Sequence, residues 1–166
     1  MKIQLIVIEA VLMGTFATLL MDFLAGILAK RKLIYSFISS EAIGRWFLYI
    51  FKGKLLHQDI NETPKLKDEK LWCIISHYLI GIALAGVYLV LDSNIAFIND
   101  QIWMSLVFGI ATVCFPWFWL LPSIGIGIMA SNSPNRSQII KTNLLNHTNF
   151  GLGLLLWILL FHRFFI

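Results

Sequence analysis

Charged residues are scarce in this sequence, and their scarcity excludes most soluble fold classes. Asp, Glu, Lys and Arg make up only 13% of the 166 residues, whereas 58% are hydrophobic. Soluble domains typically contain about 25% charged residues, so this composition is typical of an integral membrane protein whose main partner is the lipid bilayer. The formal net charge of +4 does not argue for a nucleic-acid partner, because its distribution matters more than its sum.

Cysteine is scarce too, and the two that occur form no recognisable site. Cys73 and Cys114 lie in separate apolar segments, without the spacing of a disulfide framework or a zinc site. We expect both to be small buried residues.

A signal-peptide pattern is also missing. The first apolar run, 3–29, is longer than an h-region of about 7–15 residues and has no convincing cleavage site, so we expect it to be retained.

What the sequence does contain is four apolar segments that are long enough to cross a bilayer as helices. They are residues 3–29, 71–91, 102–121 and 144–161. Lipid offers backbone groups no partner outside a helix or a closed barrel, and the strand alternation of a barrel is missing. We therefore predict an all-α integral membrane protein with four transmembrane helices, forming a single domain over residues 1–166.

The loops between these segments predict how the protein is oriented. Nine of the thirteen Lys and Arg residues fall in the loop 30–70. The loop 92–101 has two aspartates and no base, whereas the loop 129–143 contains Arg136 and Lys141. The positive-inside rule then places loops 30–70 and 129–143 in the cytoplasm and both termini on the outer side of a bacterial inner membrane.

Two segments depart from the plain apolar pattern. Leu33–Phe51 has roughly helical apolar spacing, with Ser39 or Ser40 available as a cap, and predicts an amphipathic helix on the inner membrane surface. Pro116 and Pro122 predict a kink or break in the third span. For residues 122–135 we expect either a continued helix or irregular backbone that lines a cavity.

Three ionisable side chains lie inside the predicted spans at a similar depth. Counted from the nearest lysine at about 1.5 Å per residue, Asp22, His77 and His147 are roughly 9–12 Å inside the cytoplasmic boundary. Small residues recur one or two turns away on the same face of each helix, and such stripes mark helix contacts in membranes. We therefore expect all three side chains to face the inside of the bundle.

A weak internal repeat relates two of these spans. The sequence His77-Tyr-Leu-Ile-Gly81 matches His147-Thr-Asn-Phe-Gly151 as His-x-x-x-Gly. Spans two and four run in the same direction. The match therefore fits either two parallel two-helix repeats about an axis along the membrane normal or a chance similarity between apolar helices.

A set of short motifs is distributed over nearly the whole chain. These are Gly14-Thr-x-Ala-Thr-x-x-Met-Asp22, Gly44-Arg45-Trp46, His57, His77-Tyr78, Gly81-Ile82, Pro122, Gly125-x-Gly127, Ala130-Ser131, Pro134-Asn135, His147 and Phe150-Gly151-x-Gly153. Together they resemble the signature of DUF2938, a bacterial four-span inner-membrane family described only as a domain of unknown function. The resemblance implies the four-helix architecture and draws attention to Asp22, His57, His77 and His147. It implies no activity.

The residues leave several functions open. An Asp–His pair can simply hold two helices together. A transition-metal or haem site is an alternative, because histidine is the commonest metal ligand and carboxylate suits the same metals, although the Glu-x-x-His pairs of di-iron bundles are missing. Further alternatives are a small proton-coupled transporter or channel, a lipid-headgroup site with Ser133 among its phosphate ligands, and an accessory subunit that acts with a membrane partner or a second copy.

Among these, we predict a ligand- or metal-binding cluster in the cytoplasmic leaflet. Asp22, His77 and His147 would build it, and His57 with the segment 122–135 would close it. The residues expected to line it are Arg45, Pro122, Gly125, Gly127, Ser131, Asn135, Arg136 and Asn143.

Two further ionisable residues are interpreted separately. Glu9 lies about six residues inside the outer boundary and is expected to reach outward or to be protonated. His162 stands among phenylalanines near the outer interface. We interpret both as interfacial anchors.

Overall fold

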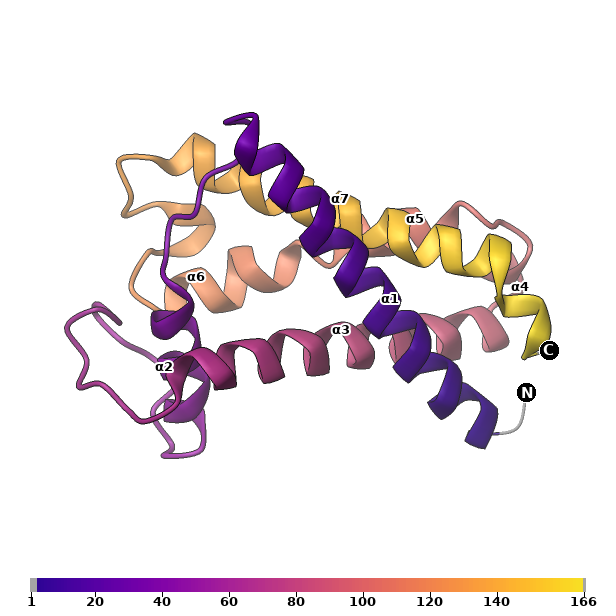
Figure 1. Ribbon diagram of the computed structural model, residues 1–166, viewed down its shortest axis with the longest axis horizontal. Coiled ribbons are helices and arrows are strands. Elements are labelled where there is room, and N and C mark those ends of the chain that lie inside the picture. Colours follow the sequence, from indigo (N-terminus) through magenta and orange to yellow (C-terminus); the bar gives the residue numbers. More distant parts are fainter. Residues whose placement is uncertain (1–2, 166) are drawn as a thin grey trace.

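The computed structural model describes residues 3–165, and over this range it contains helices and no strand (Figure 1). Four helices are long and apolar enough to cross a membrane: α1 (Ile3–Lys30), α3 (Glu69–Asn94), the interrupted helix Met104–Ser123, and α7 (Arg136–Leu160). The predicted all-α, four-span architecture is therefore confirmed, and the apolar helices indicate a bilayer environment.

Glycine contacts set how the long helices cross. In Figure 1, α1 runs diagonally across α3 and α7. A Cβ on Gly14 of α1 would overlap the backbone of Ile82 in α3. In the same way α5 (Met104–Ala111) packs on α7 where Gly109 meets Gly151. Small residues let membrane helices approach closely, so the predicted small-residue stripes do mark helix contacts.

The third span is interrupted at its first proline, as the sequence predicts. Pro116 begins a π-helical turn, η1 (Pro116–Leu120), in which the N–H of Leu121 donates to the carbonyl of Pro116. Proline has no N–H of its own, so the regular ladder cannot pass through it. The helix resumes for one turn as α6 (Leu121–Ser123).

The chain after α6 forms irregular backbone, which settles one of the two alternatives for this segment. Gly125 and Gly127 have φ of +94° and +81°, a left-handed region that glycine adopts at low cost. The short turn η2 (Ile128–Ala130) contains Met129 at φ +48°, outside helical geometry. The segment therefore turns back toward α7 and does not continue the third helix.

Two helix boundaries differ from the prediction. α7 begins at Arg136, well before residue 144, so most of the predicted loop 129–143 is helix. Its polar first turns are packed against the chain, since Thr142 accepts a hydrogen bond from the N–H of Tyr35. The amphipathic helix α2 (Ser40–Ile50) starts later than Leu33, capped by Ser39, whose hydroxyl accepts from the N–H of Ala42 at 3.1 Å.

The two ends of the bundle are easily told apart. We call the end that holds residues 31–68 and 124–135 the loop end. The other, which we call the terminal end, holds the start of α1, the end of α7, α4 (Ala96–Asn99) and η3 (His162–Phe164). α3 and α7 both run from the loop end to the terminal end, as the parallel-repeat hypothesis requires; the repeat itself stays a prediction.

The apolar core is divided into two clusters. One lies in the half near the terminal end: Ala10, Met13, Ala17, Ala85, Tyr88, Leu89, Phe150, Leu154 and Trp157. The other lies at the loop end: Ala42, Trp46, Ile60, Leu121, Ile124, Ala130 and Ile139. Between these two clusters along α1, α3, α5 and α7 lies a set of polar side chains that we call the polar layer: Asp22, His77, Tyr78, Thr112, Asn143, Asn146, His147 and Asn149.

Candidate functional site

The structure brings two of the predicted site residues into direct contact. His77 Nε2 and Asp22 Oδ1 lie 2.9 Å apart, joining α3 to α1. The Tyr78 hydroxyl donates to Asp22 Oδ2 at 3.3 Å. Asp22 is one turn beyond Thr18, which packs against Gly81. The pair therefore sits just past the closest approach of the two helices.

The Asp22–His77 pair is open on one side. The side chain of His77 is 40% exposed and that of Asp22 is 46% exposed, although both lie within membrane-spanning helices. A charged group in contact with hydrocarbon costs at least about 2.5 kcal/mol on insertion scales. This face of the bundle therefore favours contact with water, a ligand or another polar surface over contact with hydrocarbon.

His147 lies in the polar layer but bonds to a different helix. Its Nδ1 is 2.7 Å from the hydroxyl of Thr112, which itself donates to the carbonyl of Gly109. The Thr112 hydroxyl thus links the His147 ring on α7 to the end of α5. Within residues 3–165 no group of three or more His, Cys, Asp or Glu side chains is placed to hold a metal ion.

Three asparagines of α7 add unsatisfied groups to the polar layer. In the part of the chain that the structure describes, Asn143 Nδ2, Asn146 Oδ1 and Asn149 Nδ2 are buried without a hydrogen-bond partner. A buried donor or acceptor without a partner costs about 1–3 kcal/mol. The polar layer therefore has hydrogen-bonding capacity that the protein itself does not use.

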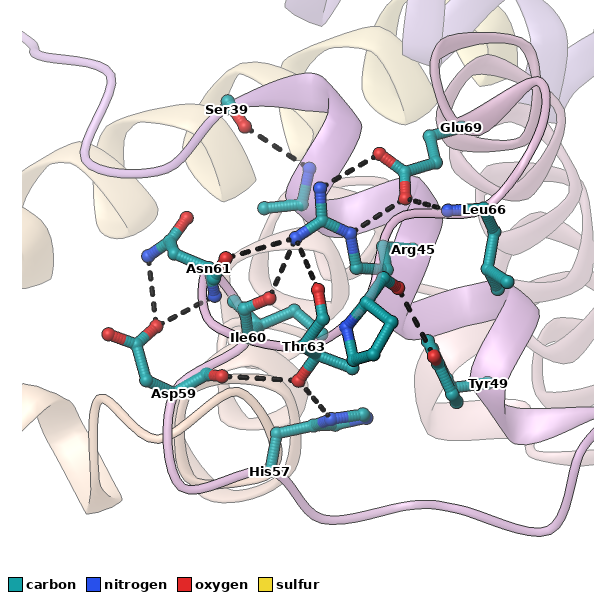
Figure 2. A network of polar contacts seen from close by, with 12 residues as sticks. Ser39, Arg45, Tyr49, His57, Asp59, Ile60, Asn61, Thr63, Leu66 and Glu69 are labelled. Carbon is teal, nitrogen blue, oxygen red and sulfur yellow. Dashed lines mark hydrogen bonds and ion pairs between the residues drawn. The ribbon is translucent and has the colours of Figure 1, made fainter.

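Arg45 is the centre of a separate network at the loop end (Figure 2). Its side chain is 5% exposed and forms a two-pronged ion pair with Glu69, with Nε–Oε1 and Nη2–Oε2 distances of 2.7 and 3.0 Å. Its Nη1 donates to the carbonyls of Ile60, Asn61 and Thr63. The predicted lining residue Arg45 thus holds the loop 51–68 to the start of α3 and does not reach the polar layer.

His57 belongs to this loop network and not to a shared histidine cluster. Its Nδ1 is 3.0 Å from the hydroxyl of Thr63, and its backbone N–H donates to the carbonyl of Ser123 at 2.8 Å. Burial lowers the pKa of His57 below the ordinary value of 6.5, so the ring stays neutral at physiological pH. The backbone bond to Ser123 docks the loop against the end of the third span.

A cavity of about 450 Å³ opens at the loop end. Its walls come from the residues 36–38, 58–61, 124–126 and 132–135, together with Ile139. Of the predicted lining residues, Gly125 and Asn135 line this cavity. Pro122, Gly127, Ser131 and Arg136 do not line it, and Arg136 Nε donates to the carbonyl of Met129 at 3.0 Å. The residues predicted to form one site therefore lie in two separate places in the structure, the polar layer and the loop end around this cavity.

A third polar cluster, at the terminal end, was missed by the sequence reasoning. The Glu9 side chain is fully buried, and its Oε1 lies 2.7 Å from His162 Nδ1 and accepts a hydrogen bond from Trp157 Nε1. Asp92 Oδ2 lies 3.7 Å from the other ring nitrogen of His162 and accepts a hydrogen bond from Asn99. The interpretation of Glu9 and His162 as interfacial anchors is therefore wrong. The available signal was a carboxylate in an otherwise apolar segment.

Comparison with known proteins gives a family and no activity. Searches of curated proteins and of solved structures find no match. A family model described as "Protein of unknown function (DUF2938)" matches residues 11–160 and so covers most of α1, the other three spans and the loop-end cavity. The chain is a multi-pass membrane protein, and it belongs to the DUF2938 family.

Proposed function

We propose that this protein binds a small polar ligand in the polar layer and exchanges a proton with it at Asp22 and His77. The observation that carries the proposal is the Asp22–His77 contact of 2.9 Å, whose two side chains stay almost half exposed inside membrane-spanning helices. A carboxylate and an imidazole in hydrogen-bond contact can share, accept or release a proton as a ligand binds. Such residues commonly mark ion and proton pathways in membrane proteins.

The unsatisfied asparagines indicate the kind of ligand. Asn143 and Asn149 each have a buried amide donor without a partner, and Asn146 has a buried acceptor, within residues 3–165. A ligand that occupies this layer should therefore both accept and donate hydrogen bonds. An apolar ligand would leave these groups unpaired, so we expect a hydrated solute and not a hydrocarbon.

Metal or haem ligation is less well supported than a polar solute. His77 Nε2 contacts Asp22 on α1, whereas His147 Nδ1 contacts Thr112 at the end of α5, so the two histidines are directed at different helices. The described residues provide no group of three ligands. We therefore base no step of the mechanism on a metal.

The proposal includes an orientation, with the loop end in the cytoplasm of a bacterial inner membrane. Nine of the thirteen Lys and Arg residues lie between Lys30 and Lys70, which supports this placement by the positive-inside rule. In a variant lacking Cys73 and Cys114, a cysteine at Lys65 should resist an impermeant thiol reagent in intact cells, and one at Asp100 should react. The reverse labelling pattern would invert the orientation.

Water access to the polar layer gives the sharpest test of the proposal. In the same cysteine-free background, Asp22→Cys should react rapidly with a charged, water-soluble thiol reagent on inside-out vesicles. Phe23→Cys is the matched control, because Phe23 is the next residue and is more exposed, at 66%, but apolar. If Asp22→Cys reacts no faster than Phe23→Cys, the face is covered by lipid or protein and the proposal fails.

Ligand binding itself can be tested by thermal unfolding in detergent. Amino acids, primary amines and polyols are screened as separate probe sets for stabilisation of the wild-type protein. A true ligand of the polar layer should stabilise the wild type and not Asp22→Asn, while Asp100→Asn behaves as the wild type. Stabilisation of all three proteins alike would show binding elsewhere.

A further inference from the structure

The loop-end cavity is a second site, separate from the polar layer. It has a volume of about 450 Å³, and the Asp22, His77 and His147 side chains do not line it. A volume of this size suits a small molecule or a lipid headgroup. We propose that this cavity binds a ligand with a primary ammonium group, held by the carboxylate of Asp59, and we expect the ligand to be the headgroup of an aminophospholipid.

The wall that carries Asp59 is held in place before any ligand arrives. Arg45 Nη1 donates to the carbonyls of Ile60 and Asn61, the two residues that follow Asp59 along the wall. On the other side, the N–H of Ile60 donates to the carbonyl of Ile124 at 3.2 Å. A Cβ on Gly125 would overlap the carbonyl of Gln58, so the two walls are in direct contact. Such preorganisation favours binding, because little ordering remains to be done.

The charge of the lining selects the ligand class. Asp59 is the charged residue of the lining, and its Oδ1 accepts hydrogen bonds from the backbone and the side chain of Asn61 at 2.7 and 3.0 Å. These bonds fix the carboxylate and leave Oδ2 facing no protein donor within residues 3–165. The remaining polar lining consists of neutral amides and hydroxyls, including Gln58, Ser133 and Asn135. A carboxylate among neutral groups attracts a cation and rejects an anion that brings no positive charge of its own.

The surroundings favour a lipid as the source of the ammonium group. Phe37, Ile38 and Ile126 give the cavity apolar walls beside its polar ones. Asn135 lies at the start of α7, whose first N–H groups have no intrahelical partner, and Arg136 follows it. A phosphate attached to the ammonium group would meet these positive groups, while the acyl chains remain in the adjoining bilayer.

Native mass spectrometry of the protein in mixed-lipid nanodiscs tests this inference. The probes are phosphatidylethanolamine and phosphatidylcholine, whose quaternary ammonium has no N–H to donate. We expect the wild type to retain phosphatidylethanolamine selectively, and Asp59→Asn to lower its retention by about tenfold, which corresponds to the loss of one charge-assisted hydrogen bond. Glu62→Gln is the matched control, because Glu62 is an exposed carboxylate of the same loop that does not line the cavity.

A competition arm identifies the source of the ammonium group. Displacement of the lipid by free ethanolamine at similar concentration would support a soluble amine as the ligand, and displacement only by lipid would support the headgroup. Equal retention by the wild type and Asp59→Asn, or equal retention of both lipids, would overturn the inference. Asp22→Asn should leave lipid retention unchanged, so failure here is distinguishable from failure of the polar-layer proposal.

Discussion

This bundle contains two carboxylate–imidazole pairs with nearly equal N–O distances but different surroundings. Glu9 and His162 are 2.7 Å apart near the terminal end, with side chains that are 0% and 12% exposed. Asp22 and His77 are 2.9 Å apart in the polar layer, with side chains that are 46% and 40% exposed. The first pair is enclosed by Trp157, and the second faces outward from the crossing of α1 and α3.

Under the proposed function, this difference assigns a structural role to the Glu9–His162 pair and a ligand-binding role to the Asp22–His77 pair. An enclosed pair cannot meet a ligand, and its removal leaves a buried charge unpaired, so it should contribute mainly to stability. An open pair contributes little to stability, because solvent or ligand already competes with it. Identical chemistry at two positions of one fold should therefore give opposite phenotypes, and the following predictions test that contrast from the largest expected effect to the smallest.

The largest effect should follow from the loss of the enclosed histidine. His162→Ala leaves the buried Glu9 carboxylate with Trp157 as its remaining donor. Breaking one partner out of a buried ion pair costs about 3–5 kcal/mol, and we expect a loss near the lower limit because Trp157 stays. Unfolding titrations in mixed detergent micelles measure it. A loss as small as that of an exposed control, Arg163→Ala, would contradict the contrast.

A smaller loss should follow from a change at the second enclosed pair, at the loop end. Arg45→Lys keeps the positive charge but cannot form the two-pronged contact with Glu69 and the carbonyl contacts at the same time. We expect the unfolding free energy to fall by about 2 kcal/mol. Lys70→Arg, at an exposed ion pair with Glu41, serves as the control and should change stability little. Equal losses of unfolding free energy in the two variants would show that burial of the ion pair does not determine its contribution to stability.

The pH dependence of stability should come from the enclosed pair. The hydrogen bond to Glu9, opposed by burial, raises the pKa of His162 above its ordinary value of 6.5. A histidine with a raised pKa stabilises the fold fully below the unfolded pKa and loses this contribution as pH rises through the folded pKa. The wild type should therefore lose stability from about pH 6.5 upward. His162→Gln should flatten this part of the profile, and an unchanged profile would contradict the assignment.

The smallest stability effect should come from the open pair. Asp22→Asn should change the unfolding free energy by less than about 1 kcal/mol, as for exposed ion pairs in general. The same substitution should abolish stabilisation by a polar-layer ligand. A loss of 3 kcal/mol or more, comparable with that of His162→Ala, would mean that Asp22–His77 is enclosed in the membrane, by a second copy or by a partner subunit.

The spans and one contact could be predicted from the sequence because both depend on simple periodicities. Apolar length is enough to find the four spans. Depth counting, combined with small residues on one helix face, brought Asp22 and His77 together. The same argument grouped His147 with them, whereas its hydrogen-bond partner in the structure is Thr112. Depth does not determine which neighbouring helix a side chain contacts. Gly151, one turn beyond His147, packs against α5, and His147 therefore contacts Thr112 at the end of that helix.

The other features of the structure could not be predicted, because they depend on irregular backbone or on contacts between residues far apart in the sequence. Neither produces a periodic pattern of apolar or small residues. Residues 136–143 look like a loop because they are polar, yet α7 includes them. The separation of the loop-end cavity from the polar layer follows from the docking of His57 and Ile60 onto the third span through backbone bonds. Such bonds do not depend on residue type. The contact between Glu9 and His162 joins the two ends of the chain, 153 positions apart.

The Arg45 network has a consequence for the biogenesis of the protein. Arg45 emerges from the ribosome before its partner Glu69, and the carbonyls of Ser123 and Ile124 that dock the loop 51–68 follow much later. The partners of Arg45 are therefore all present once the start of α3 has been made, whereas the docking of the loop through Ser123 and Ile124 must wait for the third span. A chain that stops before residue 123 would contain every partner of Arg45 but would lack the two backbone bonds that dock the loop 51–68 onto the third span.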